Sequence, residues 1–333
     1  MMRASILLKP AARLLAMSLL LCAASPQRAL AADGGPVVSA VFAGDVMLAG
    51  LPGEEISKGR DPFMPFSAVL DSSDIRIANL ECVIATVGRA EDKPYTFRAH
   101  PRSLKVLKRH LDAVSVANNH TGDFGPLAFA EMLDLLDQSG TLYFGGGRNL
   151  SAAHAPLIIE RKGLKIALLG YNEFFPRSFE ADVDKPGHAW SEDEQVVADI
   201  RHARGTLKAD LVIPFMHWGF EDEPVAGPHQ RLLAHKMIDA GADAVIGGHP
   251  HVTQDIEHYL GKPIIYSLGN FIFDGFTRRD NNTGWLLKLE LDRDGVRGWR
   301  AHVGHIDRRG TPHPAPAGLC WQRGWQKESA CNP

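Results

Sequence analysis

Residues 244–251, AVIGGHPH, join a short apolar run to two histidines that are separated by one proline. The apolar run predicts a buried strand, and the two glycines before His249 predict a tight turn after it. Such a turn can aim the imidazoles of His249 and His251 at one metal ion. A His-x-His pair alone is more often two ordinary histidines, so the prediction of a metal site depends on other residues of the chain.

Residues of the types that bind metals also follow four other predicted strands. These strands are expected at 38–43, 75–78, 113–117 and 211–216, and the residues that follow them are Asp45, Glu81, Asn119 with His120, and His217. The carboxyl ends of parallel strands meet at one edge of a sheet, so these side chains can converge there. Imidazole, carboxylate and amide ligands suit Mn, Fe or Zn, and they lack the thiolates of a structural zinc site.

The predicted strands alternate with predicted helices, which are expected at 101–110, 126–138, 191–207 and 231–240. Within 126–138 the apolar residues recur at the spacing of one helix face, and Ser191 with Glu194 predicts a capping box for the next helix. Alternation of apolar strands with helices predicts an α/β fold with a largely parallel sheet covered on both faces.

The remaining strands are expected in two antiparallel pairs. One pair is 157–161 with 164–170, and the other is 285–291 with 296–303, around Asp294-Gly295. These hairpins suggest a second, mixed sheet. Residues 307–333 are rich in proline and glycine, and they predict an irregular C-terminal tail.

The N-terminus has the pattern of a secretory signal. Arg3, Lys9 and Arg13 precede an apolar run at 14–24, and small residues occupy the positions that a signal peptidase reads at 29–31. This predicts a signal peptide at 1–31, a folded domain at 32–306 and the tail at 307–333. The protein is then expected to be exported, into the periplasm or out of the cell. Retention of the segment as a membrane anchor is the alternative.

Composition limits the partners of the protein. The formal net charge is −3 at pH 7, and the sequence has no run of basic residues, which argues against a nucleic-acid partner. Cys82 lies in an apolar run and is expected to be a buried thiol. Cys320 and Cys331 lie close together in the tail, and an oxidising compartment would allow them to form a disulfide.

Six short motifs occur in an order that resembles one protein family. They are FAGD at 42–45, ANLE at 78–81, ANNH at 117–120, HWG at 217–219, GHPH at 248–251 and YSLGNF at 266–271. Their order is similar to that of the CapA-like family of capsule and poly-γ-glutamate synthesis, within the calcineurin-like metallophosphoesterase superfamily. The resemblance covers residues 38–274, and it implies a four-layer αββα sandwich.

The resemblance also implies roles for individual residues. The metal ligands would be Asp45, Glu81, Asn119, His217, His249 and His251. His120 resembles the histidine that steadies a leaving group. Asp123 and Glu221 are candidates to accept hydrogen bonds from the histidine rings, and Asn270 is expected to hold a loop or to contact substrate.

Two motifs depart from the pattern of the superfamily. Met47 stands where the superfamily has a histidine after Asp-x, and Glu81 stands where the superfamily has its bridging aspartate. The site therefore lacks one imidazole, so we expect one tightly held ion in place of a pair.

Three functions remain open from the sequence. The chain could be a metal-dependent hydrolase that acts on a γ-glutamyl amide or a phosphoester, with an acidic polymer or a small molecule as substrate. It could be a non-catalytic accessory subunit that holds an acidic polymer beside a membrane synthase. It could also be a metallophosphodiesterase or nucleotidase.

Overall fold

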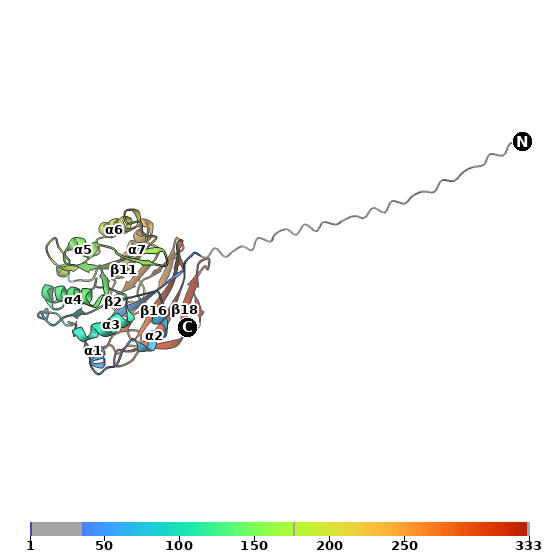
Figure 1. Cartoon of the computed structure of the whole chain (residues 1–333). Coiled ribbons are helices and arrows are strands. Elements are labelled where there is room, and N and C mark those ends of the chain that lie inside the picture. The colour runs from blue at the N-terminus through green and yellow to red at the C-terminus, as the bar shows by residue number, and fades with distance from the viewer. Residues whose placement is uncertain (2–34, 176, 332–333) are drawn as a thin grey trace. The chain divides into compact units, whose positions relative to one another are not determined.

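Two β-sheets form the middle of the protein (Figure 1). In the first sheet the parallel strands are β1 (Val38–Val46), β2 (Ile75–Leu80), β5 (Ala113–Ser115) and β6 (Leu142–Phe144). Antiparallel strands extend it beyond β1, namely β16 (Thr283–Asp292), β17 (Gly295–Ile306), β18 (Pro312–Gln322) and β19 (Ser329–Cys331). The short strand β15 (Asn270–Ile272) pairs with the end of β1.

The second sheet has a parallel centre and antiparallel edges. Its order is β13 (Ile256–Tyr259), β14 (Lys262–Ile265), β12 (Val245–Gly248), β11 (Leu211–His217), β9 (Leu164–Asn172) and β8 (Leu157–Arg161). Two small ribbons lie outside both sheets, β3 (Val83–Ile84) with β4 (Arg98–Ala99) and β7 (Gly146–Gly147) with β10 (Gly187–His188).

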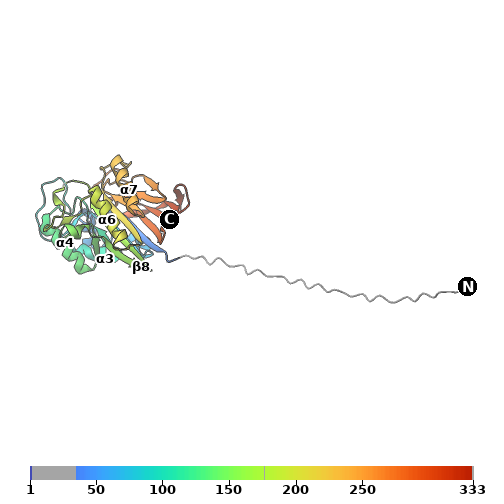
Figure 2. The ribbon, with the colours of Figure 1, turned by 90° about the horizontal axis from the view of Figure 1, so that it is seen from above.

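Helices cover the outer faces of the two sheets (Figures 1 and 2). Those on the side of the first sheet are α1 (Gly50–Ser57), α2 (Ser67–Asp71), α3 (Leu104–His110) and α4 (Gly125–Ser139). Those on the side of the second sheet are α5 (Leu150–His154), α6 (Asp193–Gly205) and α7 (Pro228–Ala240). Single 3-10 turns occur at η1 (Met64–Phe66), η2 (Pro101–Ser103) and η3 (Arg177–Phe179).

Three separate apolar clusters lie between these layers. Along β1, Val41 and Ala43 pack toward the helices of the first sheet, whereas Phe42 packs toward the second sheet. Along β11, Ile213 faces the first sheet and Val212 faces α6 and α7. Alternate side chains of a strand point to opposite faces, so both central strands are buried on both sides. The αββα sandwich is therefore confirmed.

Removing one methylene from the cluster between the sheets is expected to destabilise the protein measurably. Ile213 is fully buried there, so Ile213→Val should lower the free energy of unfolding by about 0.5–1.5 kcal/mol. Chemical denaturation of this variant is compared with Leu127→Ala on α4, where the side chain is 73% exposed and the expected change stays within about 0.5 kcal/mol. Equal losses in both variants would contradict the assignment of Ile213 to a close-packed layer.

The structure describes Met1 and residues 35–175 and 177–331, and the part from Gly35 onward forms one compact unit. Apart from Met1, the predicted signal peptide at 1–31 lies outside the described residues. The signal peptide and the domain boundaries therefore stay predictions. No helix within the described ranges is both long enough and apolar enough to cross a membrane.

The predicted irregular C-terminal tail is wrong. β18 pairs with β17, β19 pairs with β18, and Trp321 lies opposite Trp299. Of the three prolines of β18, Pro316 lies where the register of β17 and β18 shifts, whereas Pro312 and Pro314 lie opposite Ile306 and Gly304. The hairpin of β16 and β17 also joins the first sheet through β1, so the prediction that it builds a second sheet is wrong.

Two further predictions concern single residues. The capping box at Ser191 is wrong, because α6 begins at Asp193 and its N-cap residue, Glu192, makes no side-chain cap hydrogen bond. Cys82 is a buried thiol, and burial raises its pKa to about 12. Cys320 and Cys331 lie on the paired strands β18 and β19, and both are free thiols in this structure. A disulfide between them in an oxidising compartment stays a prediction.

Candidate metal centre

The predicted ligands lie where the two sheets present the carboxyl ends of their parallel strands. Asp45 is near the end of β1 and Glu81 directly follows β2, whereas His217 ends β11 and His249 follows β12. The two edges meet, because the backbone N–H of His249 donates to Asp45 Oδ2 at 3.2 Å. Residues 204 positions apart in the sequence are therefore joined at one point.

The loop after β12 holds both of its histidines in an uncommon backbone conformation. His249 has a φ of +94° and His251 a φ of +56°, in the left-handed region that L side chains rarely adopt. Such conformations cost about 1–3 kcal/mol each and concentrate at functional sites. A Cβ at Gly248 would lie 2.7 Å from Asp45 Oδ1, so glycine is needed for the approach of this loop to β1.

Glu81 is the centre of the cluster. Its Oε1 lies 3.8 Å from His217 Nε2, 3.8 Å from His251 Nε2 and 4.0 Å from His120 Nε2. Ligand atoms of Glu81, His249 and His251 lie within 4.8 Å of one another, and so do those of Asp45, Glu81 and His217. Ligands about 2.1 Å from a shared ion are separated by about 3–4 Å, so the spacing of these atoms fits a divalent metal.

Buried polar atoms without partners provide the test of that fit. Among the described residues, no hydrogen-bond donor reaches either oxygen of Glu81, and both ring nitrogens of His249 also lack a partner. Both side chains are fully buried. A buried polar group without a partner is costly, and a cation would supply the missing interaction for both residues.

The pKa shifts of the site also favour a bound cation. Burial raises the pKa of Glu81 well above its usual value, and the neighbouring charge of Asp45 raises it further. Burial also raises the pKa of Asp45, against the opposing effect of His251. The pKa values of His217 and His249 are lowered by burial and then by neighbouring histidines. Neutral imidazoles bind metals, and a divalent cation favours ionised carboxylates.

Asparagines hold several of these side chains in place. Asn119 Oδ1 lies 2.8 Å from His217 Nε2, and Asn270 Oδ1 lies 2.8 Å from His251 Nδ1.

The amide of Asn79 donates to Asp45 Oδ1 at 2.8 Å, and the amide of Asn118 donates to Asn79 Oδ1 at 2.9 Å. Neither Asn79 nor Asn118 is predicted from the sequence to have a role, although both lie inside the quoted motifs.

His120 lies beside the cluster with a fixed orientation. Its Nδ1 is 2.8 Å from Asp123 Oδ2, and Asp123 also pairs with Lys93. Because Nδ1 is engaged, Nε2 is the atom that faces Glu81. Burial lowers the pKa of His120, and its contact with Asp123 opposes that effect.

The cluster opens into a cleft of about 700 Å³. His120 and His251 line it together with Met47, which is buried and supplies no imidazole. Arg98, the exposed Glu221 and the half-buried Asp274 bring charge to the cleft. Most of the other large side chains in the lining are aromatic, namely Tyr95, Phe97, Phe124, Phe273 and Phe276.

Replacing Glu81 with glutamine should have opposite effects in metal-free and metal-loaded protein. Folding raises the pKa of Glu81 above its usual value of 4.5. Above pH 4.5 the folded protein therefore binds more protons at Glu81 than the unfolded protein does, and the folded protein loses stability as the pH rises. Metal-free Glu81→Gln should therefore melt a few degrees higher than the unchanged protein at pH 8, and less so at pH 5. With metal, the unchanged protein should be the more stable one.

Thermal melting with and without a chelator measures both effects. Glu160→Gln, at an exposed position of β8, is the matched control and should change neither melting curve. A metal-free Glu81→Gln variant that melts below the unchanged protein at pH 8 would contradict the electrostatic account.

Comparison with known proteins gives a consistent family match. The model of the family described as "Bacterial capsule synthesis protein PGA_cap" matches residues 39–275. The chain is 33% identical over 287 residues to "PGA biosynthesis protein CapA" of Bacillus subtilis (strain 168), covering 84% of this chain and 74% of that protein. It is 32% identical over 236 residues to a "Probable polyglutamine synthesis accessory protein" of Mycobacterium tuberculosis, covering 65% of this chain and 60% of that protein.

Among solved structures, the chain is similar to the NAD nucleotidase NadN of Haemophilus influenzae. The identity is 12% and the TM-score 0.46, and the match covers 84% of this chain and 60% of that one.

Proposed function

Since this chain belongs to the bacterial capsule synthesis family PGA_cap, we propose that it is a metal-dependent hydrolase acting on γ-glutamyl amide bonds of an acidic capsule polymer. The observation that carries the proposal is the pair of buried, unpartnered side chains of Glu81 and His249 beside an open cleft. A closed structural site would leave no position for substrate, whereas this one has His120 and His251 in the lining of the cleft.

The cluster would hold one divalent Mn, Fe or Zn ion. Its ligands would come from Asp45, Glu81, Asn119, His217, His249 and His251. When bound, such an ion acts as a Lewis acid on a carbonyl or phosphoryl oxygen and makes water a stronger nucleophile at neutral pH. Met47 lines the cleft without an imidazole, which favours one ion over two.

His120 would act on the leaving group. Asp123 accepts from Nδ1, so Nε2 of the neutral ring can take up a proton, and the imidazolium that Asp123 stabilises can then give that proton to the departing nitrogen. Lys93 pairs with Asp123 and donates to the backbone oxygen of Asn119 at 2.8 Å, which fixes the position of the loop that carries His120.

The cleft suits a substrate with both methylene groups and carboxylates. Its aromatic side chains can bury the methylenes of a γ-glutamyl chain. Arg98 is held by the backbone oxygens of Val87 and Gly88 at 3.2 and 3.3 Å, and its guanidinium lies 4.3 Å from the ring centroid of Phe124. A carboxylate of the polymer can pair with Arg98, because a guanidinium has further donors.

We infer the place of action from the N-terminal sequence. The basic residues and the apolar run at 14–24 support export, so the site would meet its polymer outside the cytoplasm. A membrane synthase that supplies the polymer would be its partner.

Hydrolysis by the purified chain tests the proposal. The protein is loaded with Mn²⁺, Fe²⁺ or Zn²⁺ and incubated with poly-γ-glutamate, and new amino groups and chain length are measured. We expect chain shortening that a chelator abolishes. Turnover of p-nitrophenyl phosphate esters without any cleavage of poly-γ-glutamate would show that the protein is a phosphoesterase and not an amide hydrolase.

A second candidate function is a non-catalytic accessory subunit of the polymer synthase. The observation that favours it is Met47, which removes one imidazole from the cleft. In that case the loaded protein would bind poly-γ-glutamate and hydrolyse neither substrate. A polymer-binding measurement beside the hydrolysis assay therefore separates the two functions.

A further inference from the structure

One carboxylate that lines the cleft at the metal centre has no partner in the part of the chain that the structure describes. It belongs to Glu221, which is exposed and forms no hydrogen bond or ion pair there. The loop that carries Glu221 is nevertheless fixed. The backbone N–H of Asp222 donates to the oxygen of Pro250 at 2.9 Å, and the carboxylate of Asp222 accepts the amide of Asn281 at 2.7 Å. Pro250 lies between two of the proposed histidine ligands, so Glu221 is held beside them.

The charge of Glu221 reaches the metal centre. Burial raises the pKa of Glu81 most, the charge of Asp45 comes next, and the charge of Glu221 adds to both. Because the interaction between two charges weakens with distance, Glu221 lies close to the proposed ligands. Its carboxylate therefore shares the cleft with His120 and His251.

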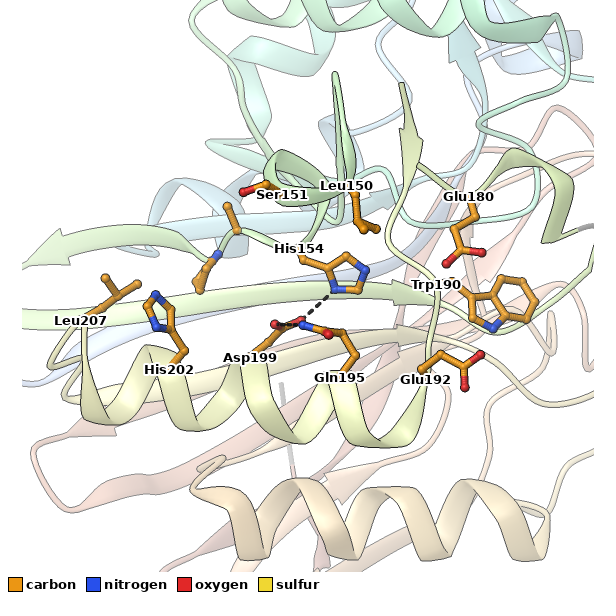
Figure 3. Close-up of a pocket in the computed structure, with 12 residues that line it drawn as sticks. Leu150, Ser151, His154, Glu180, Trp190, Glu192, Gln195, Asp199, His202 and Leu207 are labelled. Atoms are coloured by element: carbon orange, nitrogen blue, oxygen red, sulfur yellow. Dashed lines mark hydrogen bonds and ion pairs between the residues drawn. The ribbon is translucent and has the colours of Figure 1, made fainter. Parts of the chain in front are cut away.

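The carboxylates of another large hollow differ from that of Glu221. This hollow of about 680 Å³ lies between α5 and α6, and the acidic residues that line it are Glu180, Glu192 and Asp199 (Figure 3). Arg177 pairs with both glutamates, and Asp199 Oδ2 lies 2.8 Å from the ring nitrogen Nδ1 of His154. Those carboxylates are already engaged within the protein, whereas that of Glu221 is available to a ligand.

The charges of the cleft favour a ligand that carries a cation. The lining contains one guanidinium, Arg98, and two carboxylates, Glu221 and Asp274. Asp274 accepts the backbone N–H of Leu51 at 2.9 Å, at the N-terminus of α1, where the helix dipole compensates part of its charge. A divalent ion would be balanced by its own two carboxylate ligands. Once Arg98 pairs with a carboxylate of the polymer, Glu221 is left without a counter-charge in the lining.

The interior and the amino end of a γ-glutamyl chain differ in charge. Each interior residue carries an α-carboxylate and no cation, so an interior stretch would bring only negative groups to Glu221. The amino-terminal residue carries an ammonium and a carboxylate on the same carbon. Like charges placed together are costly and opposite charges are complementary, so the amino end fits a cleft lined by both Glu221 and Arg98.

We propose that the cleft binds the amino end of the chain, with the terminal ammonium on Glu221 and the terminal α-carboxylate on Arg98. This inference rests on the γ-glutamyl substrate of the proposed function. Three carbons separate the ammonium from the γ-carbonyl carbon of the same residue, so that carbonyl stays near the metal centre. Hydrolysis there would consume one water, break the bond from the carbonyl carbon to the next nitrogen, and release one glutamate. The nitrogen would take both hydrogens of that water and become the next terminal ammonium.

Two γ-linked glutamate hexamers, one with a free amino end and one with an acetylated amino end, test the inference. Their affinities are measured by calorimetric titration of the metal-loaded His120→Gln variant, in which slow turnover leaves the ligands intact. We expect the free hexamer to bind about tenfold more tightly, the gain expected for one charged hydrogen bond. Adding Glu221→Gln should remove that preference.

Glu223→Gln in the same His120→Gln background is the matched control, because Glu223 is exposed two residues further along and lies outside the lining of the cleft. This control should keep the preference for the free hexamer. Equal affinities for the two hexamers, or a preference that survives Glu221→Gln, would overturn the inference.

The products that the metal-loaded protein forms without any substitution separate this inference from the proposed hydrolase. They are identified by mass spectrometry. Release of single glutamates from the free hexamer alone supports both. Equal cleavage of the two hexamers, or cleavage that begins at interior bonds, overturns the amino-end inference and leaves the hydrolase. Cleavage of neither hexamer, with the preference in binding intact, overturns the hydrolase and leaves the amino-end site.

Discussion

Replacing His249 with alanine should remove the bound metal and reduce hydrolysis to background. Both ring nitrogens of His249 are buried without a partner, and a metal would supply the interaction for the one that carries the lone pair. Loss of residues that merely orient a ligand lowers metal affinity by about 10–100-fold, so loss of a ligand itself should lower it by at least about 100-fold. Metal content after dialysis and turnover of poly-γ-glutamate are measured on the same preparation.

His313→Ala is the control for this experiment. His313 is 54% exposed and contacts Asp307 at 3.0 Å, far along the chain from every proposed ligand. This variant should retain both metal and turnover. Full metal content in His249→Ala, or turnover by metal-free protein, would contradict the ligand assignment.

Replacing His120 with glutamine should separate metal binding from turnover. His120 belongs to neither group of residues whose ligand atoms lie within 4.8 Å of one another, and its Nδ1 is held by Asp123, so we assign it a proton-transfer role and not a ligand role. Loss of a general acid should lower kcat about 10²–10⁴-fold. The metal content should stay unchanged.

The control is His305→Gln, at an exposed position of β17. It should preserve kcat and metal content. A His120→Gln variant that loses its metal would make His120 a ligand, and one with unchanged kcat would exclude the proposed role.

Much of the site could be predicted from the sequence because parallel strands bring their carboxyl ends together. That rule and the identity of the side chains were enough to single out Asp45, Glu81, His217, His249 and His251. The roles of Asn79 and Asn118 could not be predicted, since an asparagine that holds a carboxylate has the same sequence signal as one in a turn. Their partners are 34 and 39 positions away.

The elements that the sequence did not reveal depend on contacts between distant residues. β18 contains three prolines, which predicts a coil, yet the free edge of β17 supplies the partners that make it a strand. Tertiary pairing of this kind overrides local preference. In the same way, His154 and Asp199 are 45 residues apart, and only the packing of α5 against α6 brings them together.

The number of metal ions per chain tests the central claim most directly. The full chain is loaded with Mn²⁺, Fe²⁺ or Zn²⁺, dialysed, and analysed by inductively coupled plasma mass spectrometry against the protein concentration. We expect one ion per chain, held by the cluster around Glu81. A chain that retains no divalent ion would contradict the metal centre, and two ions per chain would contradict the inference drawn from Met47.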